Sequence, residues 1–214
     1  MKTALTALTL ALAAALPVVA QAQTTVFNTG TPVGPVVGNS IGIDPQDWIA
    51  ESFTLTQATT ISSIMAYVAS SQPSTDIGQT YTIALYGSRS SKAGLVPNYS
   101  GPASQLDAFS QTYEVDGWSG PSGLSLNLAA GSYFVAVEAD ANDGVLNLVV
   151  PNGVSTLPSA VAQYNGGNSY VADPAIASDA FGLRVTAAVP EPSSLALLLA
   201  GLGLTAVIVR RRRG

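Results

Sequence analysis

The chain has 214 residues, of which 10% are charged and none is Cys or His. These counts exclude disulfide bonds, Cys-His and Ser-His-Asp catalytic groups, and zinc sites built on imidazole or thiolate ligands. Between its two apolar ends, the segment 23–189 carries three basic and twelve acidic side chains, a net charge of −9. Phosphate backbones repel so acidic a chain, and we therefore expect no nucleic-acid partner.

The N-terminus has the parts of a secretory signal peptide. Lys2 provides the positive charge, a thirteen-residue apolar stretch follows, and Ala20 and Ala22 are the small residues of a signal peptidase site. Thirteen apolar residues are fewer than the roughly 17 to 25 of a spanning helix, which disfavours an uncleaved anchor. We predict that segment 1–22 directs export by the Sec machinery, and that signal peptidase removes it to leave Gln23 first.

The middle of the chain shows the periodicity of short strands. Apolar residues alternate with polar ones or form short runs, turn residues separate the runs, and no segment shows a convincing 3.6-residue period. This pattern predicts an all-β domain over residues 23–187, an antiparallel β-sandwich of the jelly-roll type. We expect a tight turn at residues 129–131 and strands at residues 52–55, 64–68, 80–85, 109–115, 124–128, 132–139, 145–150 and 181–186.

The routes to catalysis that remain are weakly supported. A Ser-Lys dyad would need Lys92, which we place in a solvated loop. Glycoside hydrolysis needs two carboxylates about 5 to 10 Å apart, and Asp47/Glu51 or Glu114/Asp116 are examples of such pairs. Twelve acidic residues always provide pairs of this kind, so we expect a protein that is not an enzyme.

One acidic segment has side-chain oxygens at alternate positions, as in a calcium-binding loop. It runs from Glu138 to Gly144 with the sequence E-A-D-A-N-D-G. An EF-hand loop has glycine at its sixth position and glutamate at its twelfth, whereas this chain has Asp143 and Val149 there. We therefore expect a hairpin turn joining two strands, with no metal and no other cofactor.

Aromatic residues outside the expected strands are candidates for stacking on sugar rings. Trp118, set between glycine and serine residues, is our speculative glycan contact, and Tyr99, Tyr164 and Tyr170 lie in similar loop-like segments. For each of them we favour the alternative, in which the ring packs over the edge of the sandwich. Trp48 stands at the head of a strand and is expected in the core.

The C-terminus combines three features in a fixed order. Prolines flank Glu191, and because they disfavour helix and sheet pairing, this segment should stay accessible. The uncharged residues 193–209 would span about 25 Å as a helix, which is at the short end of the transmembrane range, and we expect a single transmembrane helix there. Arginines at the end would remain cytoplasmic and keep the domain outside the inner membrane. These stop residues are Arg210, Arg211, Arg212 and Arg213.

The segment 188–214 resembles the PEP-CTERM sorting signal, which is also called the ice-binding protein C-terminal domain. The resemblance implies processing by an exosortase, a membrane-embedded enzyme of Gram-negative bacteria that make exopolysaccharide. Pro190, Glu191 and Pro192 would be its recognition residues. The chain would be anchored in the inner membrane before cleavage and reach the cell surface or medium afterwards. The sequence has no regular Thr-x-Thr array, so we do not infer ice binding from the second name.

A second resemblance concerns the domain. Four segments resemble jelly-roll domains of PEP-CTERM proteins: W-I-A-E-S-F-T-L at 48–55, T-T-I-S-S-I at 59–64, L-A-A-G-S-Y-F-V-A-V at 128–137 and F-G-L-R-V-T at 181–186. This resemblance implies a fold and no activity. Two functions stay open. One is a non-catalytic structural or adhesive surface or matrix protein, and the other is a carbohydrate-binding module or, more remotely, a carboxylate-dependent glycosidase. Exopolysaccharide is a candidate partner of either.

Overall fold

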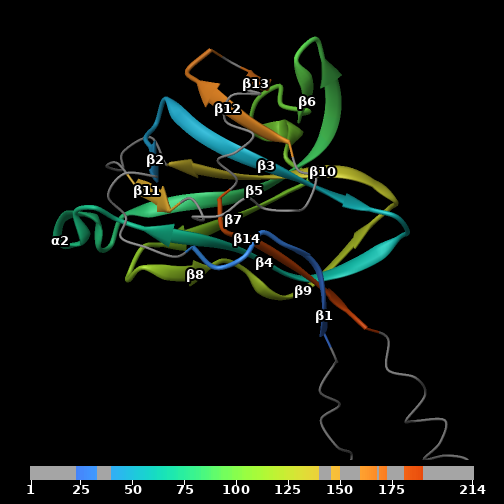
Figure 1. The fold of residues 1–214 in the computed structure, drawn as a ribbon, viewed down its shortest axis with the longest axis horizontal. Helices are drawn as coiled ribbons and strands as arrows, with labels where there is room; N and C mark the ends of the chain where they lie inside the picture. Colours follow the sequence, from blue (N-terminus) through green and yellow to red (C-terminus); the bar gives the residue numbers. More distant parts are fainter. Residues whose placement is uncertain are drawn as a thin grey trace, which may run out of the picture. The chain divides into compact units, whose positions relative to one another are not determined.

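The computed structural model describes residues 23–32, 40–139, 146–149, 160–167, 169–172 and 181–189. Residues Gln23–Ala188 form one compact unit, shown in Figure 1. Its described part contains two antiparallel sheets and two short helices, α2 (Pro73–Asp76) and η1 (Pro102–Ser104). Among these residues, no helix has the length and apolar character needed to cross a membrane.

The first sheet is organised around its longest strand, β4. The strand order along the sheet is β1, β14, β4, β11 and β2, and strands β8 and β9 pair with β4 as well. All of these pairings are antiparallel. The bounds are β1 (Gln23–Asn28), β14 (Leu183–Ala188), β4 (Thr59–Ala69), β11 (Leu146–Val149), β2 (Ser40–Ile43), β8 (Gly117–Ser119) and β9 (Ser122–Leu128).

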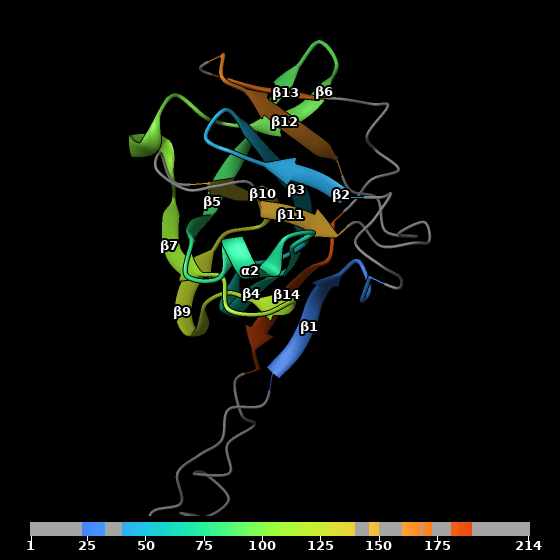
Figure 2. The ribbon, with the colours of Figure 1, turned by 90° about the vertical axis from the view of Figure 1, so that its left-hand side faces the viewer.

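The second sheet curls toward itself. Its strand order is β13, β12, β3, β10, β5 and β6, and β7 pairs with β5. Strand β13, at one end of this order, lies against β6 at the other end, as Figures 1 and 2 both show. The bounds are β13 (Tyr170–Ala172), β12 (Val161–Asn165), β3 (Asp47–Leu55), β10 (Gly131–Ala139), β5 (Thr80–Ser91), β6 (Gly94–Pro97) and β7 (Asp107–Thr112).

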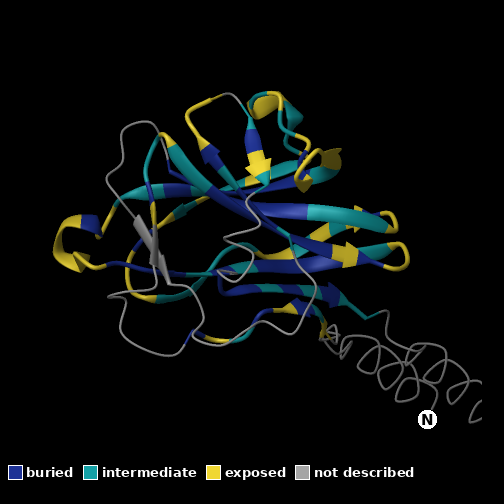
Figure 3. Cartoon of the chain, turned by 45° about the horizontal axis from the view of Figure 1, so that its top comes forward, coloured by how far each residue is buried: buried dark blue, intermediate teal, exposed yellow. Residues whose placement is uncertain are grey.

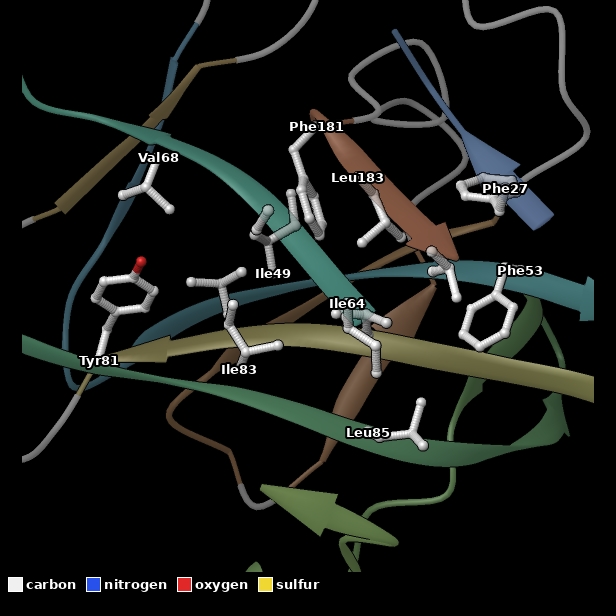
Figure 4. Close-up of a cluster of buried hydrophobic side chains, with 14 of the residues drawn as sticks. Phe27, Ile49, Phe53, Ile64, Val68, Tyr81, Ile83, Leu85, Phe181 and Leu183 are labelled. Carbon is white, nitrogen blue, oxygen red and sulfur yellow. The ribbon is translucent and has the colours of Figure 1, made fainter. Parts of the chain in front are cut away.

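A main core takes buried side chains from both sheets (Figure 4). Phe53 of β3 and Ile83 of β5 come from the second sheet, and Ile64 of β4 and Leu183 of β14 come from the first. Each of these four side chains is at most 1% exposed. Burying one such side chain contributes about 1.5 to 3 kcal/mol, so this core is the main source of stability in a chain without cysteine. Exposed positions are concentrated in the turns and in α2 (Figure 3).

The structure confirms the all-β, antiparallel fold over the described residues. The eight expected strands coincide with β3, β4, β5, β7, β9, β10, β11 and β14. The jelly-roll sandwich and the signal peptide stay predictions, as do the domain limits. Segment 1–22 lies outside the described residues, and so does the expected transmembrane helix at 193–209.

Lys92 is exposed in the turn of the β5–β6 hairpin, which agrees with the solvated position expected for it, although the residues on either side of the turn are paired strands. Two predicted connections are wrong. The turn at 129–131 does not join paired strands, since β9 belongs to the first sheet and β10 to the second. The strands on either side of the acidic segment do not form the expected hairpin either, because β10 pairs with β3 and β5 whereas β11 pairs with β2 and β4. Alternation within one strand does not identify its partner, and this caused the errors.

Candidate functional site

The two processing segments join the folded unit at paired residues. In the β1–β14 pair, Gln23 lies opposite Ala188. The expected signal peptide would therefore end, and the expected sorting segment begin, at adjacent strands of one sheet. The processing residues themselves lie outside the described residues: Ala20, Ala22, Pro190, Glu191, Pro192, Arg210, Arg211, Arg212 and Arg213.

The face of the second sheet that points away from the main core has a floor of small side chains. Alanines stand opposite one another on successive strands, and the four central ones are fully buried. Because a methyl group is small, larger side chains from neighbouring rows can lie flat across this floor. The row consists of Ala172, Ala162, Ala50, Ala136, Ala84 and Ala108.

Aromatic rings cover this floor and form a second core. Trp48 stacks on Tyr164 with ring centroids 4.2 Å apart. Tyr99 lies with its ring edge-on to Trp48, Tyr86, Tyr164 and Tyr170, at centroid distances of 5.6 to 6.1 Å. Tyr86, Tyr164 and Tyr170 are buried, whereas Trp48 and Tyr99 are half-buried. The second sheet encloses these rings because β13 curls back against β6.

A buried carboxylate lies within this second core. Glu138 Oε1 accepts hydrogen bonds from the hydroxyls of Tyr86 at 2.7 Å and Tyr170 at 2.8 Å, and Oε2 accepts one from Gln105 Nε2 at 3.1 Å. Burial, and secondarily the charge of Glu138, raise the pKa of Tyr86 and of Tyr170 well above the usual value for tyrosine. Both hydroxyls therefore stay protonated and keep donating to the carboxylate.

The placement of these residues corrects part of the sequence analysis. Tyr164 and Tyr170 are in strands β12 and β13, not in loops, although their rings do pack against the protein as we favoured. Trp48 contacts the main core and the second core alike. Reasoning from the sequence missed the role of Glu138, which was considered only as a calcium ligand. The one available signal was a glutamate inside an otherwise apolar strand.

Trp118 has a different setting, on the first sheet. It was expected in a loop, but it is the central residue of strand β8, opposite Tyr67 of β4. The two rings meet edge to face with centroids 5.6 Å apart, and Arg184 of β14 places its guanidinium carbon 4.2 Å from the centre of the Trp118 ring. All three side chains are half-buried. We call Tyr67, Trp118 and Arg184 the Trp118 patch.

Two close backbone contacts fix the patch in place. A Cβ atom added to Gly120 would lie 2.1 Å from the carbonyl oxygen of Ile64, so only glycine lets the end of β8 approach β4 this closely. A Cβ added to Gly182 would lie 2.6 Å from Cβ of Tyr67. The backbone that carries the patch is therefore closely packed at both of these glycines.

Among the described residues, no carboxylate forms a salt bridge with Arg184, whose guanidinium lies over the Trp118 ring. The acidic residue nearest to Trp118 in the sequence, Asp116, is already engaged. Its Oδ1 accepts hydrogen bonds from the Ser70 backbone N–H at 2.9 Å and from the Tyr113 hydroxyl at 2.5 Å. The Trp118 patch thus combines two aromatic rings with a guanidinium that pairs with no carboxylate of the described residues.

The two carboxylate pairs noted in the sequence lie in different settings. Asp47 and Glu51 are four residues apart on the extended strand β3, which separates them by roughly 13 Å, and Glu51 is fully buried. Glu114 is exposed next to a segment where Asp116 is engaged in structural hydrogen bonds. The buried Asp76, which the sequence did not single out, accepts a hydrogen bond from the hydroxyl of Ser70.

Comparison with known proteins identifies the C-terminal segment. Residues 188–213 match the family model of the PEP-CTERM protein-sorting motif, which confirms the resemblance seen in the sequence. No curated protein matches the chain. The motif indicates export, a membrane-anchored sorting signal before processing, and an exosortase as the processing partner. The chain therefore carries a PEP-CTERM protein-sorting motif and is an exported protein sorted by an exosortase.

Proposed function

We propose that the unit Gln23–Ala188 is a non-catalytic module with a structural or adhesive role. It would act at the cell surface or in the extracellular matrix of a Gram-negative bacterium that makes exopolysaccharide. One observation carries this proposal: the matched motif begins at Ala188, where the last strand of the unit ends. Cleavage beyond that residue would release a folded unit, jelly-roll-like in our interpretation, that retains every described strand.

The position of β14 supports this reading. The strand lies between β1 and β4, and its buried residues Leu183 and Val185 belong to the main core. Pro190 follows Ala188 by two residues, which is at most roughly 7 Å of extended chain. The exosortase would thus cut close to the end of β14, the last strand of the folded unit.

Two features support a non-catalytic role. The sequence lacks the His and Cys residues of common nucleophilic sites. Among the described carboxylates, those of Glu138, Asp76 and Asp116 accept hydrogen bonds from neighbouring groups. We therefore propose that these acidic residues stabilise the fold and that the protein turns over no substrate.

The intact mass of the protein recovered from the cell surface and medium tests the sorting proposal. We expect one species that starts at Gln23 and ends near Pro190, Glu191 and Pro192. Replacing Glu191 with Gln should leave the sorting segment attached, while Glu114→Gln, a change of equal charge in the folded unit, should not. Recovery of wild-type protein that still contains Arg210–Arg213 would contradict processing.

A second candidate function is carbohydrate binding. The observation that favours it is the half-buried Trp118, held with Tyr67 on the outer face of the first sheet. Aromatic rings in such positions can stack on the apolar faces of sugar rings. A glycan array probed with the exported protein tests this candidate, and binding should be lost in Trp118→Ala.

A further inference from the structure

Two aromatic clusters lie on the outer faces of the sheets, and they differ in their remaining hydrogen-bonding capacity. In the second core, the hydroxyls of Tyr86 and Tyr170 and the amide of Gln105 are already bonded to Glu138, and three of the five rings are buried. In the Trp118 patch, all three side chains are half-buried, and the guanidinium of Arg184 bonds no described acceptor. A polar ligand would therefore form more new hydrogen bonds at the Trp118 patch than at the second core.

The patch faces away from the main core. Ala66 and Val68, on either side of Tyr67, point into that core, as do Leu183 and Val185 on either side of Arg184. Because side chains alternate along a strand, Tyr67 and Arg184 lie on the opposite, outer face. Asn28 of β1, which stands opposite Arg184, is exposed there too. The outer face thus presents polar and aromatic groups from four adjacent strands, β1, β14, β4 and β8.

The charge of the patch is opposite to that of the rest of the unit. Residues 23–189 contain only two other basic residues, Arg89 and Lys92, which are exposed in the β5–β6 hairpin. A guanidinium presents several N–H donors in a planar fork, which matches the two oxygens of a carboxylate. Trp and Arg side chains also dominate many binding surfaces. A ligand that fits the patch has a flat apolar face and a carboxylate.

We propose that the Trp118 patch binds an acidic saccharide of the uronic acid class. The guanidinium of Arg184, which lies over one face of the Trp118 ring, pairs with the sugar carboxylate, and the sugar ring packs beside it against Trp118 and Tyr67. This inference rests on the carbohydrate-binding candidate described above and adds the class of sugar. The net charge of −9 opposes binding at long range, but at 0.15 M salt such repulsion is screened beyond about 8 Å.

Calorimetric titration of the exported protein at 0.15 M salt tests the proposal. The probes are trigalacturonate and trimannuronate, each compared with its neutral methyl ester. We expect the acids to bind and the esters to bind at least about tenfold more weakly. Arg184→Gln should weaken binding of the acids to a similar extent. Arg89→Gln is the matched control, because it removes the same charge away from the patch and should leave the affinity unchanged.

Trp118→Ala should abolish binding. If the alanine variant does not fold, Trp118→Phe, which keeps an aromatic ring, is measured in its place. Equal affinity for acids and esters, or equal losses in Arg184→Gln and Arg89→Gln, would overturn the carboxylate assignment. Absence of binding by the wild type to all four probes would overturn the saccharide site. The Arg184→Gln variant should have the intact mass expected for normally processed protein. A failure of binding is therefore distinguishable from a failure of sorting.

Discussion

Gln23 and Ala188 lie opposite each other in the β1–β14 pair, so the first and last residues of the compact unit are neighbours. This arrangement depends on β1 staying on the sheet. Within β1, only Phe27 is buried, and its ring lies 6.4 Å from that of Phe53. Phe27 therefore anchors the strand that begins at the expected signal peptidase site.

Phe27→Ala should lower the free energy of unfolding by about 3 to 5 kcal/mol, because it leaves a cavity in the main core. Urea denaturation followed by circular dichroism measures this loss. Thr25→Ala, an exposed change on the same strand, is the control and should cost less than about 0.5 kcal/mol. Equal stability of the two variants would show that β1 is not anchored by Phe27.

Tyr86→Phe removes one of the hydrogen bonds to the buried Glu138 carboxylate. A bond to a charged group contributes about 1.5 to 3 kcal/mol, and we expect a destabilisation of that size. Tyr133→Phe is the same chemical change but removes only an exposed hydrogen bond to the Ala129 carbonyl. It should therefore lower the free energy of unfolding by less than Tyr86→Phe does. The difference between the two urea midpoints checks the prediction.

Alkaline pH should destabilise the unit through the tyrosines that donate hydrogen bonds to Glu138. The pKa values of Tyr86 and Tyr170 are raised in the folded protein, so these hydroxyls remain protonated at a pH where unfolded tyrosines ionise. Their contribution is complete below about pH 10 and is lost progressively as the pH rises above it. Urea midpoints measured between pH 8 and 11 should fall, and the fall should be smaller in the double variant Tyr86→Phe/Tyr170→Phe. An equal fall in the double variant would assign the effect to other groups.

Gly182→Ala should disturb the Trp118 patch, because its new methyl group would lie 2.6 Å from Cβ of Tyr67. Overpacking of this kind costs about 1 to 3 kcal/mol. Gly87→Ala is the matched control, since a Cβ there meets nothing within 4 Å. Thermal unfolding compares the variants, and the tryptophan emission spectrum should change in Gly182→Ala alone. An unchanged melting temperature for Gly182→Ala would mean that Tyr67 can move aside freely.

The sequence was informative wherever the signal is local. Period-2 alternation identified β9 and β10 because the two faces of a strand meet different environments. It missed six strands of three to six residues, which are β1, β2, β6, β8, β12 and β13. So short a strand contains too few residues to show a period, and pairing with a longer strand defines it.

The functional residues divide in the same way. The sorting motif was recognisable from contiguous residues, and the family match at 188–213 confirmed it. The link between Glu138 and its partners was not recognisable, because Tyr86 and Tyr170 are 52 and 32 residues away in the chain. Likewise, nothing near Trp118 in the sequence indicates Arg184 as its neighbour, since β4 lies between their strands and pairs with both.

The sequence by itself determined the export and sorting context, the all-β class and the absence of cysteine and histidine chemistry. Each of these depends on composition or on residues adjacent in the chain. Only the tertiary structure decided which strands pair, and with that the contact between Gln23 and Ala188, the enclosed carboxylate and the Trp118 patch. Strand pairing joins distant segments, and its register is set by hydrophobic faces that many pairings could satisfy until the whole chain packs.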